Sequence, residues 1–285
     1  MVDLCQFDHF IFLNSFLKTS NFDVATIVQK GYDAKKKEKY ELTALNAATK
    51  ESNIDIVKLL LSYKNIDVNR PNIFEYEKYK IVKNALFIAV EVENVDIINI
   101  LLEHGVDINF LNIDHDREKT ALEMAAEKGN HQIIELLLKC KNINPNIRFN
   151  KNGFHIRKQI SIIFDAVYKQ NINIVKLLLA HPQLNVNLST IQQRDNTYGD
   201  LCEEAEFTPL NAAINSKNIE IIQLLLSNSK INVNIPIIYS RFPRSEKTTD
   251  VIKNPLLLGI ETKDIEIVKL LISFDNLDIN AKNIL

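Results

Sequence analysis

A 27-residue pattern that begins TALNAATKESN at Thr43 occurs six times in this chain, and it constrains the fold more than any other feature of the sequence. The copies begin at Thr43, Asn84, Thr120, Ser161, Thr208 and Asn254, and the copy from Asn84 is one residue shorter than the others. The sixth residue of each copy is small: Ala48, Ala89, Ala125, Ala166, Ala213 and Gly259. A pattern that recurs in register indicates a repeat array.

Each copy predicts two short helices. In the first helix, Leu45 and Ala48 lie three residues apart and therefore share one face. Asn53 is expected to cap the second helix, and Asp55 lies in its first turn, where the helix dipole favours an anion. The same capping position is held by Asn94, Asn130, Asn171, Asn218 and Asp264. One helix pair cannot bury so much apolar surface, so each pair must stack on its neighbours.

The pattern resembles the ankyrin repeat and its T-P-L-H-x-A signature. The best match is the run Thr208, Pro209, Leu210, Asn211 and Ala213, in which Asn211 replaces the family's His, as Asn46 does in the first copy. The resemblance implies an all-α solenoid of helix-turn-helix repeats with β-turn or finger loops. We therefore predict one degenerate N-terminal unit with the first finger in residues 1–42, and six repeats in residues 43–285.

The turn between the two helices of a copy departs from the family pattern. Only the copy from Thr120 keeps a glycine there, Gly129. The other copies have Ser52, Glu93, Gln170, Lys217 and Lys263. Because glycine adopts the left-handed conformation without strain, we expect a weaker helix C-cap in these copies, with the adjacent Asn tolerating the unusual dihedral angles.

The segment before the first copy predicts a degenerate repeat. Aligning Ile11 with Thr43 places Leu13 over Leu45 and Asn21 over Asn53. Acidic residues precede its apolar run and no basic segment does, which is not typical of a signal peptide. We expect this unit to pack on the following repeat, as terminal units of solenoids do.

The repeats are spaced more widely than the family's period of about 33 residues. Their starts are 41, 36, 41, 47 and 46 residues apart, and the excess lies in the connectors 70–83, 110–119, 147–160, 188–207 and 235–253. The resemblance places these connectors in fingers, where insertions are often on the binding face. Aromatic and arginine side chains are frequent interface anchors. The finger residues that we predict to bind a partner are Tyr76, Tyr79, Arg148, Phe149, Phe154, Arg157, Tyr239, Arg241 and Phe242. The alternative is that the connectors are solvated loops whose aromatic residues fold back onto the stack.

The resemblance also implies a concave groove lined by the two residues that follow the core of each first helix. These predicted partner-binding residues are Lys50, Glu51, Glu91, Val92, Glu127, Lys128, Tyr168 and Lys169, with Asn215, Ser216, Glu261 and Thr262 at the same positions of the last two copies. They vary between copies, whereas the apolar positions are constant. Neutral drift of surface residues would give the same variation.

Composition and motifs favour binding over catalysis. The six glycines are too dispersed for a phosphate-binding loop, and no zinc-protease motif or nucleophile elbow occurs. Asp114, His115 and Asp116 are clustered, but neighbours in one loop rarely converge on one metal ion. We therefore expect no enzyme activity and no cofactor. The formal net charge of −2 gives no general attraction to nucleic acid or to an anionic membrane.

The function that follows is a non-catalytic scaffold or adaptor that binds a protein partner through the groove and the fingers. The alternative is binding of nucleic acid or a phosphate ligand through basic segments, which are the connector 147–160, with four basic residues and no acidic one, and Lys35, Lys36, Lys37 and Lys39. Three dispersed cysteines, Cys5, Cys140 and Cys202, indicate free thiols and a cytoplasmic location, with the nucleus as the alternative. No membrane partner is expected.

The last copy is as apolar as the internal ones, whereas the outer face of a terminal repeat is normally polar. We therefore predict weak self-association or partner docking through this repeat.

Overall fold

A computed structural model describes residues 28–33, 38–115, 117–150, 156–195, 201–241 and 248–281. The described residues fall into two compact units, Met1–Ile143 and Asn144–Leu285. The segments of the predicted N-terminal unit that precede residue 28, including Ile11, Leu13 and Asn21, lie outside the described residues.

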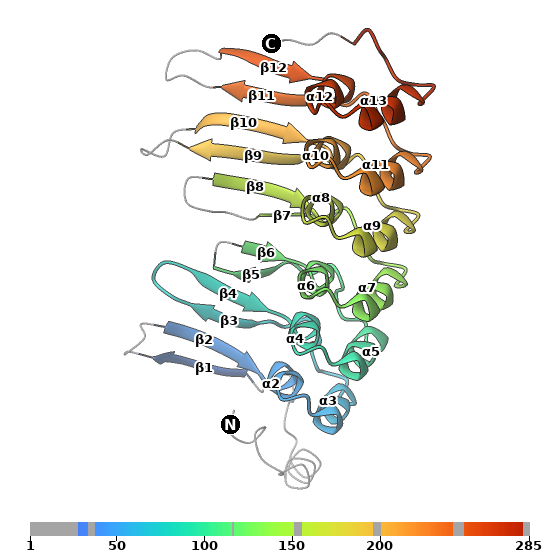
Figure 1. The fold of residues 1–285 in the computed structure, drawn as a ribbon. Helices are drawn as coiled ribbons and strands as arrows, with labels where there is room; N and C mark the ends of the chain where they lie inside the picture. Colours follow the sequence, from blue (N-terminus) through green and yellow to red (C-terminus); the bar gives the residue numbers. More distant parts are fainter. Residues whose placement is uncertain are drawn as a thin grey trace, which may run out of the picture. The chain divides into compact units, whose positions relative to one another are not determined.

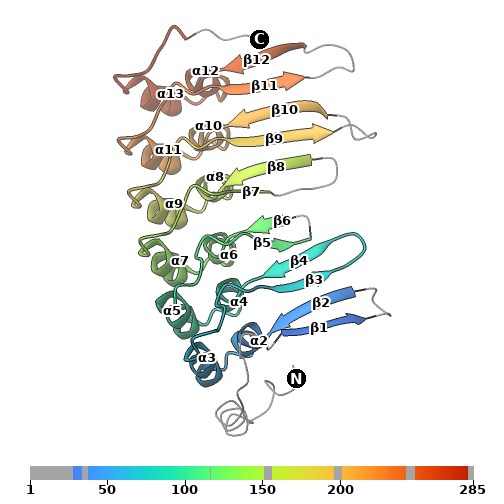
Figure 2. The same cartoon turned by 180° about the vertical axis from the view of Figure 1, so that it is seen from behind.

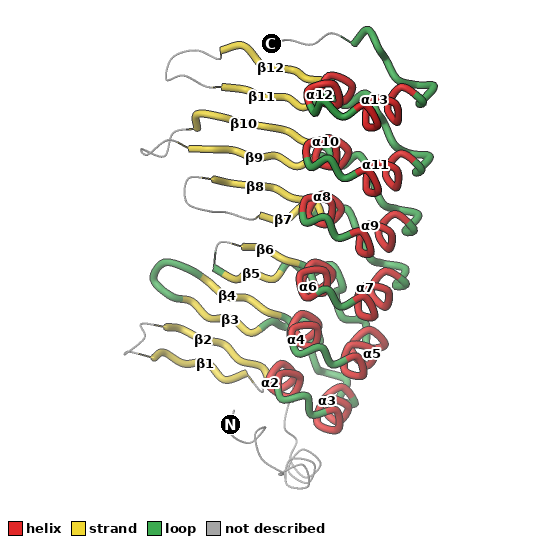
Figure 3. The backbone as a smooth tube through the Cα atoms, viewed as in Figure 1, coloured by secondary structure: helices red, strands yellow, loops and turns green. Residues whose placement is uncertain are grey.

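Each unit is built from consecutive pairs of short antiparallel helices, twelve helices in the described part of the chain. Figure 3 shows that a hairpin precedes each pair. In the first unit the pairs are α2 (Ala44–Lys50) with α3 (Ile54–Leu61), α4 (Ala85–Glu91) with α5 (Val95–Glu103), and α6 (Ala121–Lys128) with α7 (His131–Leu138). In the second unit they are α8 (Ile162–Tyr168) with α9 (Ile172–Leu179), α10 (Pro209–Asn215) with α11 (Ile219–Leu226), and α12 (Pro255–Glu261) with α13 (Ile265–Ile272).

The helix starts confirm the predicted caps. The side chain of Asn53 accepts a hydrogen bond from the backbone N–H of Ile56, three residues on, and the four equivalent asparagines cap their helices in the same manner. Asp264 caps the last helix by accepting from the N–H of Glu266, two residues on. The first residue of each copy also caps, and Thr120 forms a capping box with Glu123. The small sixth residue is buried in every copy, as expected, because the two helices of a pair approach most closely there.

The turns between paired helices differ from our expectation. The non-glycine residues themselves adopt the left-handed conformation, with φ from 54° to 60° at Ser52, Glu93, Gln170, Lys217 and Lys263. The Asn caps that follow four of these residues keep φ values between −84° and −89°. In these four turns the backbone N–H of the Asn donates to the carbonyl of the small sixth residue of the copy. Backbone hydrogen bonds of the helix end therefore hold the left-handed residue, and the Asn does not absorb the unusual dihedral angles. Three of the five side chains also contact the next repeat of their own unit, and the bond from Lys128 to Glu93 is one example.

The predicted finger loops are β-hairpins. The first unit contains β1 (Val28–Asp33), β2 (Glu38–Thr43), β3 (Asn72–Glu75), β4 (Lys80–Lys83), β5 (Asn112–Asp114) and β6 (Arg117–Lys119). The second contains β7 (Arg148–Asn150), β8 (Ile156–Ser161), β9 (Thr190–Asp195), β10 (Leu201–Phe207), β11 (Ile237–Arg241) and β12 (Thr248–Lys253). Each set forms a six-stranded antiparallel sheet in chain order, so neighbouring fingers pair with one another (Figure 1). The connectors form strands because the edge strand of each hairpin provides hydrogen-bond partners for the backbone N–H and C=O groups of the next hairpin.

In every copy but the last, the final Asn hydrogen-bonds the segment that follows the outer helix of the next repeat. Figure 2 shows these segments, which turn towards the next finger. In the second unit, Asn146 accepts from the backbone N–H of Asn185 at 2.7 Å and donates to the carbonyl of Gln183 at 2.8 Å. Asn187 and Asn234 repeat both bonds. A constant Asn at this position thus serves stacking.

Candidate partner-binding surface

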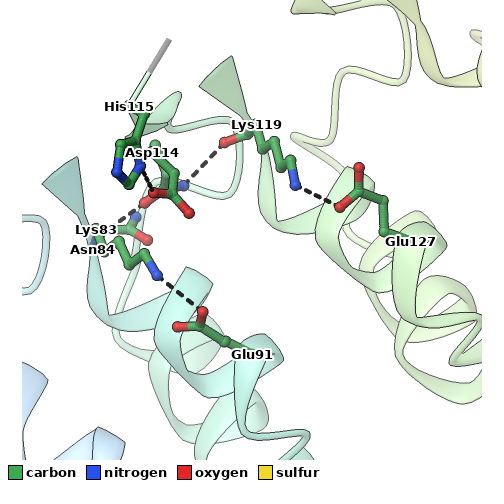
Figure 4. A network of polar contacts seen from close by, with 8 residues as sticks. Lys83, Asn84, Glu91, Asp114, His115, Lys119 and Glu127 are labelled. Atoms are coloured by element: carbon green, nitrogen blue, oxygen red, sulfur yellow. Dashed lines mark hydrogen bonds and ion pairs between the residues drawn. The ribbon is translucent and has the colours of Figure 1, made fainter. Parts of the chain in front are cut away.

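Two positions of each repeat meet where the finger joins the first helix. We call them the root pair: the residue of the finger strand that immediately precedes the copy, and the eighth residue of the copy. In three repeats the root pair is a Lys–Glu ion pair. The Nζ–carboxylate distances are 2.9 Å for Lys83–Glu91, 2.5 Å for Lys119–Glu127 and 2.8 Å for Lys253–Glu261. Figure 4 shows the first two, each side chain reaching from a strand end to the helix.

The other three root pairs carry no ion pair between their members. They are Leu42 with Lys50, Ile160 with Tyr168, and Phe207 with Asn215. Lys50 and Asn215 are exposed, and Tyr168 exposes 67% of its surface, the largest fraction among the exposed large apolar residues of the described chain, equal to that of Ile265. The root pairs therefore divide the predicted groove residues into internally paired carboxylates and accessible side chains.

The remaining predicted groove residues are also of two kinds. Glu51 and Val92 are exposed, Val92 to 37%. Lys128 forms an ion pair with Glu93 at 3.1 Å, and Lys169 forms one with Asp165 at 2.6 Å. An exposed pair of this type contributes little stability, but it lowers the charge available to a partner.

The rings of Tyr76 and Tyr79 stack at the tip of the β3–β4 finger, with centroids 4.3 Å apart. His115, from the turn of the next finger, extends the stack at 4.0 Å from Tyr79. Its ring is 2.7 Å from the carboxylate of Asp114, and its φ is 61°. The sequence did not indicate that His115 joins the two tyrosines. Pairing of adjacent fingers brings it there, and the stack ties the two hairpins together.

The basic connector 147–160 contributes less surface than predicted. Phe149 is only 4% exposed, so its ring packs inside the protein and presents no anchor to a partner. Arg148 donates from Nη2 to the Ser189 hydroxyl at 3.1 Å, and that hydroxyl in turn donates to Glu206. The Nε of Arg148 is buried and has no hydrogen-bond partner within the described residues. Arg148 is thus held by β-sheet contacts in the folded chain.

Tyr239 lies among root-pair residues of the second unit. Its ring meets that of Phe207 edge-on, with centroids 5.7 Å apart. Burial raises the pKa of the Tyr239 hydroxyl, the charge of Lys253 opposes this shift, and Glu261 adds to it. The hydroxyl is therefore neutral at neutral pH.

Four predicted finger residues cannot be placed as side chains. Phe154 and Phe242 lie outside the described residues. For Arg157 and Arg241 the backbone is described: Arg157 pairs with Gln193 and Arg241 with Glu203 in the sheet register, while their side chains lie outside the description.

No group of three or more His, Cys, Asp or Glu side chains in the described residues could hold a metal ion. Cys140 is a free, half-buried thiol whose pKa is raised by burial. None of the described helices has the length and apolar character needed to cross a membrane. The candidate surface therefore consists of stacked rings, exposed side chains and paired charges.

Comparison with known proteins identifies the repeats. A family model described as ankyrin repeats in three copies matches residues 18–112 and 74–149, and a model of a single ankyrin repeat matches residues 206–237. A fowlpox virus protein named as an ankyrin repeat protein is 31% identical over 180 residues, which cover 62% of this chain and 46% of the relative. An ankyrin repeat and KH domain-containing protein of Caenorhabditis briggsae is 27% identical over 184 residues, 55% of this chain and 7% of the relative. The chain thus spans less than half of the length of these relatives.

Proposed function

The chain belongs to the ankyrin repeat family, and from this premise we propose that it is a non-catalytic scaffold that binds a protein partner through its root pairs and finger sheets. One observation carries the proposal: a constant, buried framework presents Lys–Glu ion pairs at three root pairs and exposed Lys50, Tyr168 and Asn215 at the other three. Within each unit, a framework of this kind holds side chains from distant parts of the sequence in a fixed row. Such a row matches what a protein interface needs, namely rigid aromatic anchors among neutralised charges.

The fingers support the same function. Because adjacent hairpins are paired strand to strand, the rings of Tyr76, Tyr79 and His115 are held in one orientation before any partner arrives. Preorganised side chains lose less entropy on binding than side chains on free loops. Arg148, one of the four basic residues of the connector 147–160, contacts Ser189, which favours a protein partner over a nucleic acid at this residue.

The test uses the whole chain as an affinity bait with chemical cross-linking, and identifies which of its residues are linked to captured proteins. We expect cross-links to concentrate on residues next to Lys50, the finger tips and Tyr168. Capture in which every cross-link lies on the outer helices α3, α5, α7, α9, α11 and α13 would count against the proposal. A Gln223→Ala variant, exposed on α11, is the control for the effect of a surface change away from the root pairs.

Self-association through the last repeat remains a prediction. Ile260, Ile265, Ile272 and Ile279 are exposed by 54%, 67%, 57% and 64%. Positions equivalent to Ile260 and Ile279 are buried in internal repeats, for example Val90 at 0% and Val186 at 0%. Light scattering over a concentration series should show a rising mean mass. A constant monomer mass would contradict the prediction.

A further inference from the structure

The second unit has a row of rings at its root pairs where the first unit has two ion pairs. In the first unit, the root pairs of α4 and α6 are Lys83–Glu91 and Lys119–Glu127. In the second unit, the root pairs of α8 and α10 are Ile160–Tyr168 and Phe207–Asn215. We call Tyr168, Phe207, Asn215 and Tyr239 the aromatic strip.

The members of the aromatic strip come from adjacent helices and strands of the second unit. Helices α8 and α10 are in contact, so their eighth-position residues, Tyr168 and Asn215, occupy equivalent places on adjacent helices. Phe207 is the other member of the root pair of Asn215, and its ring contacts Tyr239 edge-on. Tyr239 pairs with Val251 in the β11–β12 hairpin, two residues before Lys253 of the next root pair.

The charges that border the aromatic strip are balanced within the protein. Lys169 pairs with Asp165 at 2.6 Å on one side, and Lys253 pairs with Glu261 at 2.8 Å on the other. A charged partner group placed here would have to compete with Asp165 or Glu261 for a lysine, or with a lysine for a carboxylate, and it would lose part of its own hydration. An uncharged group neither breaks an ion pair nor loses the hydration of a charge.

The exposed groups of the strip complement an uncharged polypeptide. Tyr168 is 67% exposed and stacks on Phe164 with the centroids 6.3 Å apart, so its ring is supported from one side and accessible from the other. A supported aromatic ring gives a large contact area at a low cost in side-chain entropy. The exposed amide of Asn215 carries both donors and an acceptor, which suits the N–H and C=O groups of an extended backbone.

We propose that the aromatic strip binds an extended, uncharged segment of a protein partner. An aromatic or aliphatic side chain of that segment contacts the ring of Tyr168, and its backbone pairs with the amide of Asn215. This inference rests on the proposed scaffold function and specifies the chemistry of the partner at one place.

The experiment selects peptides from a random library displayed on phage, with the whole chain as the target. Enriched peptides are then synthesised with a fluorescent label, and their affinities are measured by anisotropy at about 50 mM and about 500 mM NaCl. We expect enrichment of aromatic and aliphatic residues with a net charge near zero, and affinities that change little with salt.

Four variants locate the binding. Tyr168→Ala should weaken the enriched peptides by about tenfold or more, as loss of a central aromatic anchor does. Tyr168→Phe keeps the ring and should retain most of the affinity. Asn215→Asp introduces an unpaired charge and should weaken binding. Gln223→Ala, on the outer helix α11, should change nothing. Circular dichroism of each variant checks the fold, which should persist because Tyr168 and Asn215 are exposed.

Enrichment of strongly charged peptides whose affinity falls steeply with salt would overturn the inference, and so would unchanged affinity for Tyr168→Ala. An empty selection would also overturn it. These outcomes leave the scaffold function to be judged by the cross-linking experiment, in which contacts at other root pairs or at the finger tips would still support it.

Discussion

The left-handed turns between paired helices allow a matched test of what backbone strain costs in free energy of unfolding. Gly129 has φ 69°, and a Cβ added to it would meet no atom within 4 Å. Ser52 holds the equivalent place with φ 56°, and its side chain makes no hydrogen bond within the described residues. Gly129→Ala and Ser52→Gly are therefore opposite changes of the same backbone position in one unit, without a steric clash to confuse them.

The expected magnitude follows from two opposing effects. A left-handed residue with a Cβ costs about 1–2 kcal/mol relative to glycine. Glycine also makes the unfolded chain more flexible, which lowers the free energy of unfolding by about 0.4–1 kcal/mol and so offsets part of the relief of strain. The difference is about 1 kcal/mol, so Ser52→Gly should stabilise the first unit by about this amount and Gly129→Ala should destabilise it by about the same.

Urea denaturation followed by circular dichroism measures the effect. With an m-value of about 1–3 kcal/mol/M, a change of about 1 kcal/mol shifts the midpoint by about 0.3–1 M. Glu93→Gly provides an internal comparison, because it relieves the same backbone strain while losing contacts with Lys128 and Asn130. Glu93→Gly should therefore raise the urea midpoint by less than Ser52→Gly does. A midpoint that is unchanged by Gly129→Ala, or lowered by Ser52→Gly, would refute the reasoning.

Three further predictions follow from contacts described above. The hydrogen bond from Asn130, and after it the contact with Lys128, lower the pKa of the Glu93 carboxyl. The stability that ionised Glu93 contributes is therefore present above the ordinary Glu pKa and is lost as the pH falls through the lowered pKa. Glu93→Gln should reduce the difference between the urea midpoints measured at about pH 7 and about pH 4. Ala89→Leu overfills a fully buried site and should lower the free energy of unfolding by about 1–3 kcal/mol; an unchanged midpoint would show unfilled space beside α4. Lys83→Met removes the root pair with Glu91 and should cost about 0.5–1 kcal/mol at low salt and less at high salt; a cost that does not fall with salt would mean that the lysine acts through packing.

The helical framework could be predicted from the sequence because its signals are local. Asn53 and the four equivalent asparagines each accept a hydrogen bond from the N–H three residues later, so the cap and the bond that it makes are close in sequence. The small sixth residue likewise indicates a buried position of the first helix. The conformation of Glu93 and Lys217 was missed because single-residue propensity argues against φ > 0, whereas the backbone hydrogen bonds that close each turn hold these residues in it.

The candidate surface was predicted only in part, because its composition depends on contacts between residues far apart in the chain. An ionic partner for Glu91 was readable in principle: a lysine lies eight residues before the glutamate in three of the six copies. The burial of Phe149 and the stack of His115 on Tyr79 depend on which finger pairs with which, and a single sequence carries no signal for that pairing.

The strand pairing between fingers also limits how these proteins can evolve. Side chains alternate between the two faces of each sheet, so inserting one residue between Ile81 and Lys83 of β4 would place these two residues on opposite faces and break the register in which Ile81 pairs with Phe74. An insertion at the turn that joins two strands leaves every pair in register. Point substitutions can therefore change the exposed row freely, whereas changes in length are confined to the tips, and each finger can grow outward without disturbing its neighbours.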